Sequence, residues 1–173
     1  MLHAGGVIAY PTEGVFGLGC RPDDGGAVQR LLELKQRPVS AGLILIAASL
    51  EQLTDWIEPS SRELREVAAP RSGPVTWLVT AGPLTPPWIT GGRTTVAVRV
   101  TRHAVAAGLC LASGLPLVST SANRRGKPPA RSALGARLRF GRSLDLVVGG
   151  ATGGAAGPTE IRDAASGRVV RTG

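Results

Sequence analysis

The sequence predicts a single-domain α/β fold, a twisted, open, mixed β-sheet with flanking helices. Apolar runs with strand character alternate with runs of helical period along the whole chain, which is the pattern of an α/β protein. Several neighbouring strand candidates have no helix between them, so the sheet should contain antiparallel as well as parallel pairs. A chain of 173 residues suits one domain, residues 1–173, and can bury about 70% of its unfolded surface without a disulfide.

The predicted elements begin with a short apolar strand at residues 6–10, GVIAY. Residues 11–19 are rich in glycine and are expected to form a loop. Asp23 or Asp24 can cap the next helix, whose apolar residues recur at helical spacing. That helix should end within residues 35–38, because the residue before a proline is pushed out of the helical region.

A continuous apolar run predicts a fully buried strand at residues 42–47. Two short helices should follow, the first capped by Ser49 and the second by Ser60 or Ser61, with Glu63 in its first turn. The later elements are predicted as strand 73–79, loop 83–92, strand 94–100, helix 103–112, strand 115–119, helix 131–140, strand 144–148 and a closing pair of strands at 159–162 and 168–171. The glycine-rich stretch 149–157 is either a linker or a mobile cover over a site.

The composition argues against several classes of protein. The longest apolar run, residues 43–48, is far shorter than the ~20 residues that cross a bilayer, and the first residues lack the basic segment of a signal peptide. Cys20 and Cys110 predict reduced thiols in a cytoplasmic protein. His3 and His103 are too few for a zinc cluster, and a Ser-His-Asp triad would have to use His103 at a helix start.

The net charge of +8 has two explanations. A basic surface attracts polyanions such as RNA. Alternatively, the genome favours arginine, since only Lys35 and Lys127 are lysines among 20 Lys and Arg residues. The basic residues are spread along the chain instead of forming one block, which favours the second explanation. In such a chain the two lysines are candidates for a role that needs a compact point charge.

Two short motifs suggest a phosphate site. Lys35-Gln36-Arg37-Pro38 lies where a helix must stop and a buried strand begins, and residues 119–123, STSAN, offer three hydroxyls and an amide after a short strand. Cationic side chains and hydroxyls at such positions bind phosphates. Each motif also has an ordinary explanation, as a complement to a helix dipole or as a hydrogen-bonded turn. The chain has no GxxxxGK[ST] sequence, so it is not a P-loop protein, and Gly14, Gly17 and Gly19 do not fit GxGxxG.

Both motifs belong to a longer ordered pattern that covers almost the whole chain. Its segments are YPTEGVFGLGC at 10–20, LLELKQRP at 31–38, GLILIA at 42–47, GPVTW at 73–77, VAVRV at 96–100, PLVSTSAN at 116–123 and PTEIRD at 158–163. This pattern resembles the threonylcarbamoyl-adenylate synthase family, the YrdC-like enzymes of tRNA modification. It is most similar to the short bacterial form, which has only this domain.

The resemblance implies a reaction. The family joins L-threonine, bicarbonate or CO2, and ATP into L-threonylcarbamoyl-AMP and releases pyrophosphate. Threonylcarbamoyl-transferase proteins then move the group to adenosine 37 of tRNA. The carbamate made from the threonine amine attacks the α-phosphorus, so positioning and positive charge should supply most of the catalysis. Mg²⁺ is the expected partner of the triphosphate, and tRNA or double-stranded RNA binding is a further expectation.

The resemblance also implies roles for particular residues. The family's Lys-x-Arg and Ser-x-Asn pairs fall on Lys35, Arg37, Ser121 and Asn123, which are the expected catalytic residues at the ATP phosphates. Further nucleotide-binding positions fall on Thr95, Ser119 and Arg171. Arg99 is expected to pair with the threonine carboxylate, and Thr12, Gly14 and Thr159 to lie near the same amino acid. Many relatives carry a second threonine in place of Gly14 and a histidine in place of Ile46, and both positions touch threonine there.

Two alternative functions remain open on the sequence. A non-catalytic RNA-binding module would explain the pI of about 11.1, but it does not explain the Lys-x-Arg and Ser-x-Asn pairs. A sugar-phosphate enzyme of the related dihydroxybutanone-phosphate synthase fold would need an acidic metal-binding cluster. The loop around Glu13 supplies a single carboxylate.

Overall fold

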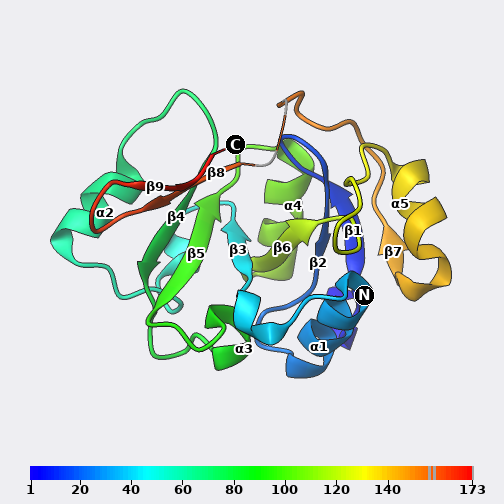
Figure 1. The fold of residues 1–173 in the computed structure, drawn as a ribbon, viewed down its shortest axis with the longest axis horizontal. Helices are drawn as coiled ribbons and strands as arrows, with labels where there is room; N and C mark the ends of the chain where they lie inside the picture. Colours follow the sequence, from blue (N-terminus) through cyan, green and yellow to red (C-terminus); the bar gives the residue numbers. More distant parts are fainter. Residues whose placement is uncertain (156, 158, 173) are drawn as a thin grey trace.

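A mixed β-sheet crosses the molecule from edge to edge (Figure 1). In this computed structural model the described residues are 1–155, 157 and 159–172, and they form nine strands in one sheet. From one edge to the other these strands are β7 (Leu146–Val147), β1 (Ile8–Pro11), β2 (Phe16–Gly19), β6 (Leu117–Ser121), β3 (Ile44–Ala47), β5 (Thr95–Val100), β4 (Val75–Thr80), β8 (Glu160–Asp163) and β9 (Val169–Arg171). The pairs β1–β7, β3–β5 and β4–β8 are parallel and the other neighbours antiparallel, so the predicted mixed sheet is confirmed.

Helices pack on both faces of this sheet. They are α1 (Gly25–Lys35), α2 (Ser61–Ala68), α3 (Pro87–Thr90), α4 (Ala104–Ser113) and α5 (Ala133–Phe140), with 3-10 turns at Leu2–Ala4, Val39–Ala41, Glu51–Leu53 and Gly141–Ser143. The larger apolar cluster packs α1 and α5 against one face, whereas a smaller one packs α4 against the other. Within the described part of the chain, no helix has the length and apolarity needed to span a membrane.

Two helix starts follow the sequence prediction closely. The Asp24 carboxylate accepts the Ala27 N–H and caps α1. Ser60 and Glu63 form a capping box at the start of α2. Glu63 also accepts hydrogen bonds from the backbone and hydroxyl of Thr80, so the cap joins α2 to β4.

The predicted loop at residues 11–19 is wrong over its second half, because residues 16–19 are strand β2, paired with β1. Gly17 and Gly19 made this segment look irregular. Both lie beside the Tyr10 ring, and a Cβ on Gly19 would be 2.4 Å from the Val118 carbonyl oxygen. These glycines therefore serve close packing inside a hairpin.

Three other predictions need correction. Ser49 caps no helix, and the segment after it is the 3-10 turn Glu51–Leu53. The predicted loop 83–92 contains α3, which has proline at its first position. Strand β6 runs on through Ser121, since Thr120 and Ser121 still pair with β2.

Candidate active site

One end of the sheet face that carries α4 is open. Ile46 and Leu117 pack beneath α4, whereas the next positions on the same face, Ile44 and Ser119, line a cavity of about 150 Å³. Of the residues expected at the site, those that line this cavity are Thr12, Gly14, Arg37, Arg99, Ser119, Ser121, Thr159 and Arg171. The strand order β2-β6-β3-β5 brings these distant segments together.

Arginine side chains dominate the charge of this cavity. Burial lowers the pKa of Arg37, and the nearby charges of Arg171 and Arg93 act in the same direction. Burial also lowers the pKa of Arg171, and the charge of Arg99 adds to this effect. Arg37 donates to the Ala41 and Gly42 carbonyls at 3.1 and 2.9 Å. Cations held this close repel one another, so the cavity suits an anionic ligand.

Lys35 lies behind the cavity and does not line it. Its ammonium donates to the carbonyls of Ser121 at 2.5 Å and Asn123 at 2.9 Å, and to Asn123 Oδ1 at 3.4 Å. Burial lowers the pKa of Lys35 to about 8, and Arg37 acts in the same direction. Lys35 therefore fastens the end of α1 to the turn after β6 and leaves a positive charge beneath it.

The turn after β6 is held by its own side chains as well. Ser121 Oγ donates to Asn123 Oδ1 at 2.6 Å. Asn123 Nδ2 donates to the carbonyls of Arg124 and Lys127, at 3.1 and 2.7 Å. Asn123 thus shapes the turn, and Ser121 is the member of the pair that lines the cavity.

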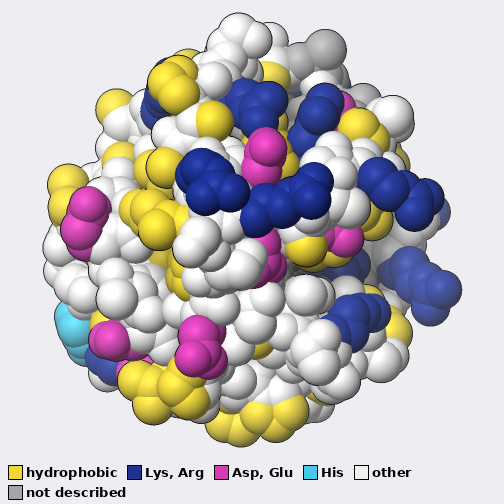
Figure 2. All heavy atoms as spheres, turned by 90° about the vertical axis from the view of Figure 1, so that its left-hand side faces the viewer, with side chains coloured by type: hydrophobic (Ala, Val, Ile, Leu, Met, Phe, Trp, Pro, Cys, Tyr) yellow, Lys and Arg dark blue, Asp and Glu magenta, His cyan; other side chains and the backbone are white. Residues whose placement is uncertain are grey.

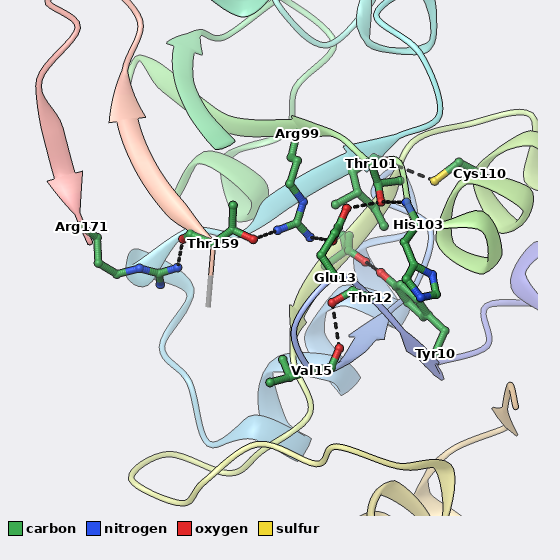
Figure 3. A network of polar contacts seen from close by, with 12 residues as sticks. Tyr10, Thr12, Glu13, Val15, Arg99, Thr101, His103, Cys110, Thr159 and Arg171 are labelled. Carbon is green, nitrogen blue, oxygen red and sulfur yellow. Dashed lines mark hydrogen bonds and ion pairs between the residues drawn. The ribbon is translucent and has the colours of Figure 1, made fainter. Parts of the chain in front are cut away.

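Arg99 also lines the cavity. Its Nη1 donates to Thr159 Oγ1 at 2.5 Å, while its Nη2 lies 3.5 Å from the Glu13 carboxylate. Arg171 donates to the Thr159 carbonyl at 2.8 Å, so Thr159 joins the two arginines (Figure 3). Arg99 is buried, and its Nε has no partner among the described residues.

The turn between β1 and β2 forms one wall of the cavity. The backbone N–H and hydroxyl of Thr12 both donate to the Val15 carbonyl, at 3.1 and 2.8 Å, which closes the turn. A Cβ on Gly14 would be 2.4 Å from the Gly157 carbonyl oxygen. Glycine at this position therefore lets the described part of the 149–157 stretch lie against the turn, where Gly153 donates to the Thr12 carbonyl.

Besides Lys35 and Asn123, two more positions singled out from the sequence lie outside the cavity. Ile46 is fully buried beneath α4, next to Tyr10 and Cys110, so it does not line the cavity. Thr95 begins β5 on the same face as Arg99, but it too lies beyond the lining residues. Thr95 and Arg99 are four residues apart along β5, which is about 13 Å in a strand, so they share a face while only Arg99 reaches the opening.

Sequence reasoning missed a buried polar network behind Arg99. Glu13 Oε1 accepts a hydrogen bond from Thr101 Oγ1 at 2.6 Å, and Thr101 Oγ1 accepts from the His103 backbone N–H at 3.2 Å (Figure 3). The available signal was the position of Glu13 between Thr12 and Gly14, since a carboxylate inside a pocket loop is unusual without a partner. Among the described residues, no group of three His, Cys, Asp or Glu could hold a metal.

A larger cavity of about 490 Å³ lies on the far side of Glu13. It is lined mainly by residues 67–75 and by apolar side chains such as Leu50 and Trp77. None of the expected phosphate-binding residues line it. Size alone does not make a site, and the smaller cavity holds the cations and hydroxyls that an anionic ligand needs.

Comparison with known proteins agrees with the pattern in the sequence. The Sua5/YciO/YrdC family model, described as "Telomere recombination", matches residues 1–173. The chain is 53% identical to a threonylcarbamoyl-AMP synthase of Nitrosococcus oceani over 174 residues, which are 99% of this chain and 93% of that protein. It is 54% identical to the enzyme of the same name from Cellvibrio japonicus, over 99% of this chain and 91% of the relative.

Solved structures share the fold. The crystal structure of P. abyssi Sua5 complexed with L-threonine superposes with a TM-score of 0.87 at 34% identity. That match covers 94% of this chain and 48% of the Sua5 chain, so this chain spans about half of Sua5. The full-length family match, together with relatives above 50% identity, shows that the chain belongs to the Sua5/YciO/YrdC family.

Proposed function

We propose that this protein is an L-threonylcarbamoyladenylate synthase, a nucleotidyltransferase that makes L-threonylcarbamoyl-AMP and pyrophosphate from L-threonine, bicarbonate or CO2, and ATP. The observation that carries the proposal is a cavity lined by three arginines, Arg37, Arg99 and Arg171, and by the hydroxyls of Ser121 and Thr159. Arg99 donates to Thr159, and the charge of Arg171 acts on Arg37. L-Threonine and ATP each present anionic groups to such a cavity. The curated relatives carry the name of this enzyme, and P. abyssi Sua5 binds L-threonine.

The chemistry needs positioning more than a nucleophilic side chain. The threonine amine adds to CO2 and loses a proton, which gives a carbamate. A carbamate oxygen then attacks the α-phosphorus of ATP, and the bond to the bridging oxygen of pyrophosphate breaks. Arg99 would hold the threonine carboxylate, while Arg37 and Arg171 would neutralise charge on the phosphates. Lys35 would hold the Ser121 turn in place and add positive charge beneath it.

Mg²⁺ would enter with ATP. The described residues contain no cluster of acidic ligands, and the cavity offers hydroxyls such as those of Thr120 and Ser121. Magnesium in phosphoryl-transfer sites is often held mostly by phosphate oxygens and water. When bound, it would withdraw charge from the triphosphate.

The wider setting of the reaction is part of the same proposal. The product would pass to proteins that transfer its threonylcarbamoyl group to adenosine 37 of tRNA, and the enzyme would work in the cytoplasm. A purely RNA-binding module would leave the buried polar cavity without a use. On the face drawn in Figure 2, the Lys and Arg side chains are interspersed with Asp and Glu, so this face does not present a continuous basic surface to RNA.

The direct test is pyrophosphate release by the purified protein. With ATP, Mg²⁺, bicarbonate and L-threonine, we expect release that stops when threonine or Mg²⁺ is left out. A matched reaction with L-valine tests whether the threonine hydroxyl is recognised. Folded protein that releases no pyrophosphate in response to threonine would exclude the proposed activity.

The pH dependence of ATP binding should show the loss of the Lys35 charge. Its pKa of about 8 means that the ammonium is charged below that pH and loses its charge as the pH rises through it. ATP affinity of the free enzyme should therefore weaken above about pH 8, as measured by calorimetry at constant Mg²⁺. In Lys35→Met, the residual ATP affinity should be flat over the same range, and a variant with the wild-type profile would assign the titration to another group.

A further inference from the structure

Glu13 lies between two residues of the cavity wall but faces away from the cavity. Thr12 and Gly14 line the cavity that contains Arg99, whereas Glu13 borders the larger cavity on the other side. The solvent-exposed fractions of the Glu13 and Arg99 side chains are only 13% and 8%. Burying a carboxylate and a guanidinium costs desolvation free energy, which the attraction between the two charges offsets. The position of Glu13 is therefore best understood through its effect on Arg99.

The contacts of Arg99 show that two groups fix its guanidinium. Thr159 Oγ1 accepts from Nη1 at 2.5 Å, and the Glu13 carboxylate lies 3.5 Å from Nη2 (Figure 3). Arg99 Nε and Glu13 Oε2 have no hydrogen-bond partner among the described residues. The Arg99–Glu13 pair is thus held in place but not saturated, which leaves donors of Arg99 available to a ligand carboxylate.

Glu13 is itself anchored to the sheet. Its Oε1 accepts from Thr101 Oγ1 at 2.6 Å, and the Thr101 N–H donates to the Ala47 carbonyl at 2.9 Å. Burial disfavours the charged form of Glu13, but the charge of Arg99 and the Thr101 hydrogen bond outweigh it, so the pKa of Glu13 lies below its usual value. Glu13 is therefore an anion on a rigid support.

Without an anion behind it, Arg99 would be repelled by the other cations of the cavity. Arg171 is close enough for the charge of Arg99 to lower its pKa, and both line the same opening. A long side chain under such repulsion would sample other rotamers, and ordering it would then cost affinity. The Glu13 carboxylate offsets this repulsion from the side opposite the ligand.

We infer that Glu13 is a positioning residue that holds the Arg99 guanidinium in the orientation needed to bind the carboxylate of the amino-acid substrate. The inference rests on the proposed function, because it takes L-threonine as that substrate. Losing the ion pair that orients Arg99 should weaken threonine binding by about 10- to 100-fold, within the range of interaction energies between residues in contact. ATP binding should change little, because Glu13 faces away from Arg37 and Ser121.

The test measures L-threonine affinity by calorimetry for wild type, Glu13→Gln, Arg99→Gln and the double variant. Glu13→Gln keeps the shape and can still accept from Thr101, but it has no charge. The control is Glu66→Gln, which removes the carboxylate of another Glu–Arg pair, with Arg71, outside the cavity. We expect weaker threonine binding in Glu13→Gln, Arg99→Gln and the double variant, but not in the control. The loss of affinity in the double variant should be well below the product of the losses in the two single variants.

A second ligand separates positioning from general damage. The carboxylate-free analogue 1-aminopropan-2-ol should bind Glu13→Gln and wild type equally. Thr101→Val, which frees Glu13 from its anchor, should weaken threonine binding in the same direction as Glu13→Gln. If Glu13→Gln does not fold, the threonine affinity of Thr101→Val tests the inference without it.

Three results would overturn the inference: unchanged threonine affinity in Glu13→Gln, effects of Glu13→Gln and Arg99→Gln that multiply independently, or a loss of kcat alone. Wild-type protein that neither binds threonine nor releases pyrophosphate would overturn the proposed function as well. The two failures are thus distinguishable.

Discussion

Lys35→Ala should lower kcat/KM for ATP by about 1,000-fold or more. The substitution removes a buried charge and the hydrogen bonds that hold the turn after β6. Lys35 donates to two backbone carbonyls of that turn. Alanine would remove the donor to the Asn123 carbonyl and would leave the Ser121 carbonyl with only the Asn123 N–H, at 2.9 Å. The turn would then move, and Ser121 with it. Pyrophosphate release at varied ATP measures the loss.

The fold should survive this change. An unsatisfied buried carbonyl costs about 1–3 kcal/mol, which is less than the stability of a typical domain. Lys127→Ala is the matched control, since Lys127 is the other lysine, is exposed, and contacts Asn123 only through its backbone carbonyl. We expect the control to keep wild-type turnover and both variants to melt cooperatively. Near-normal turnover by folded Lys35→Ala would refute the role given to this residue.

Lys35 also shows what the sequence could predict and what it could not. The helix end at residue 35 and its link to residues 121–123 were predicted as a phosphate site. The structure places the ammonium behind the turn, where it donates to carbonyls. Which way a long side chain turns depends on neighbours more than 80 residues away, and the sequence contains no distance between them.

The fold was more predictable than the details of the site. Apolar runs are long and periodic enough to locate β3, β5 and the helices. Strand β2 is harder to predict, because Gly17 and Gly19 pack closely against Tyr10 and so interrupt the apolar pattern of the strand. The site needs the strand order as well. Only the adjacency of β6, β3 and β5 explains why Ser119 and Arg99 share one cavity while Ile46 lies under α4.

Arg99→Lys and Arg99→Gln should weaken L-threonine binding by about 30-fold to 3,000-fold, the equivalent of about 2–5 kcal/mol for removing one partner of a buried charge pair. Lysine keeps a positive charge but cannot offer two parallel N–H donors to a carboxylate, so it should restore only part of the affinity. ATP affinity should change far less, because Arg37 is held by the Ala41 and Gly42 carbonyls and not by the partners of Arg99, which are Glu13 and Thr159. Calorimetry with each ligand separates the two effects.

The risk in this experiment is the carboxylate left behind. In Arg99→Gln, Glu13 would stay buried without its ion-pair partner, which destabilises a fold more than losing the pair as a whole. The double variant Glu13→Gln, Arg99→Gln removes both charges and should melt closer to wild type than Arg99→Gln does. Arg168→Ala, on an exposed turn between β8 and β9, controls for the loss of one positive charge. If folded Arg99→Gln bound threonine as tightly as the wild type, the amino-acid end of the cavity would have to be assigned elsewhere, because no other charged side chain of the described lining lies as close to Thr159 Oγ1.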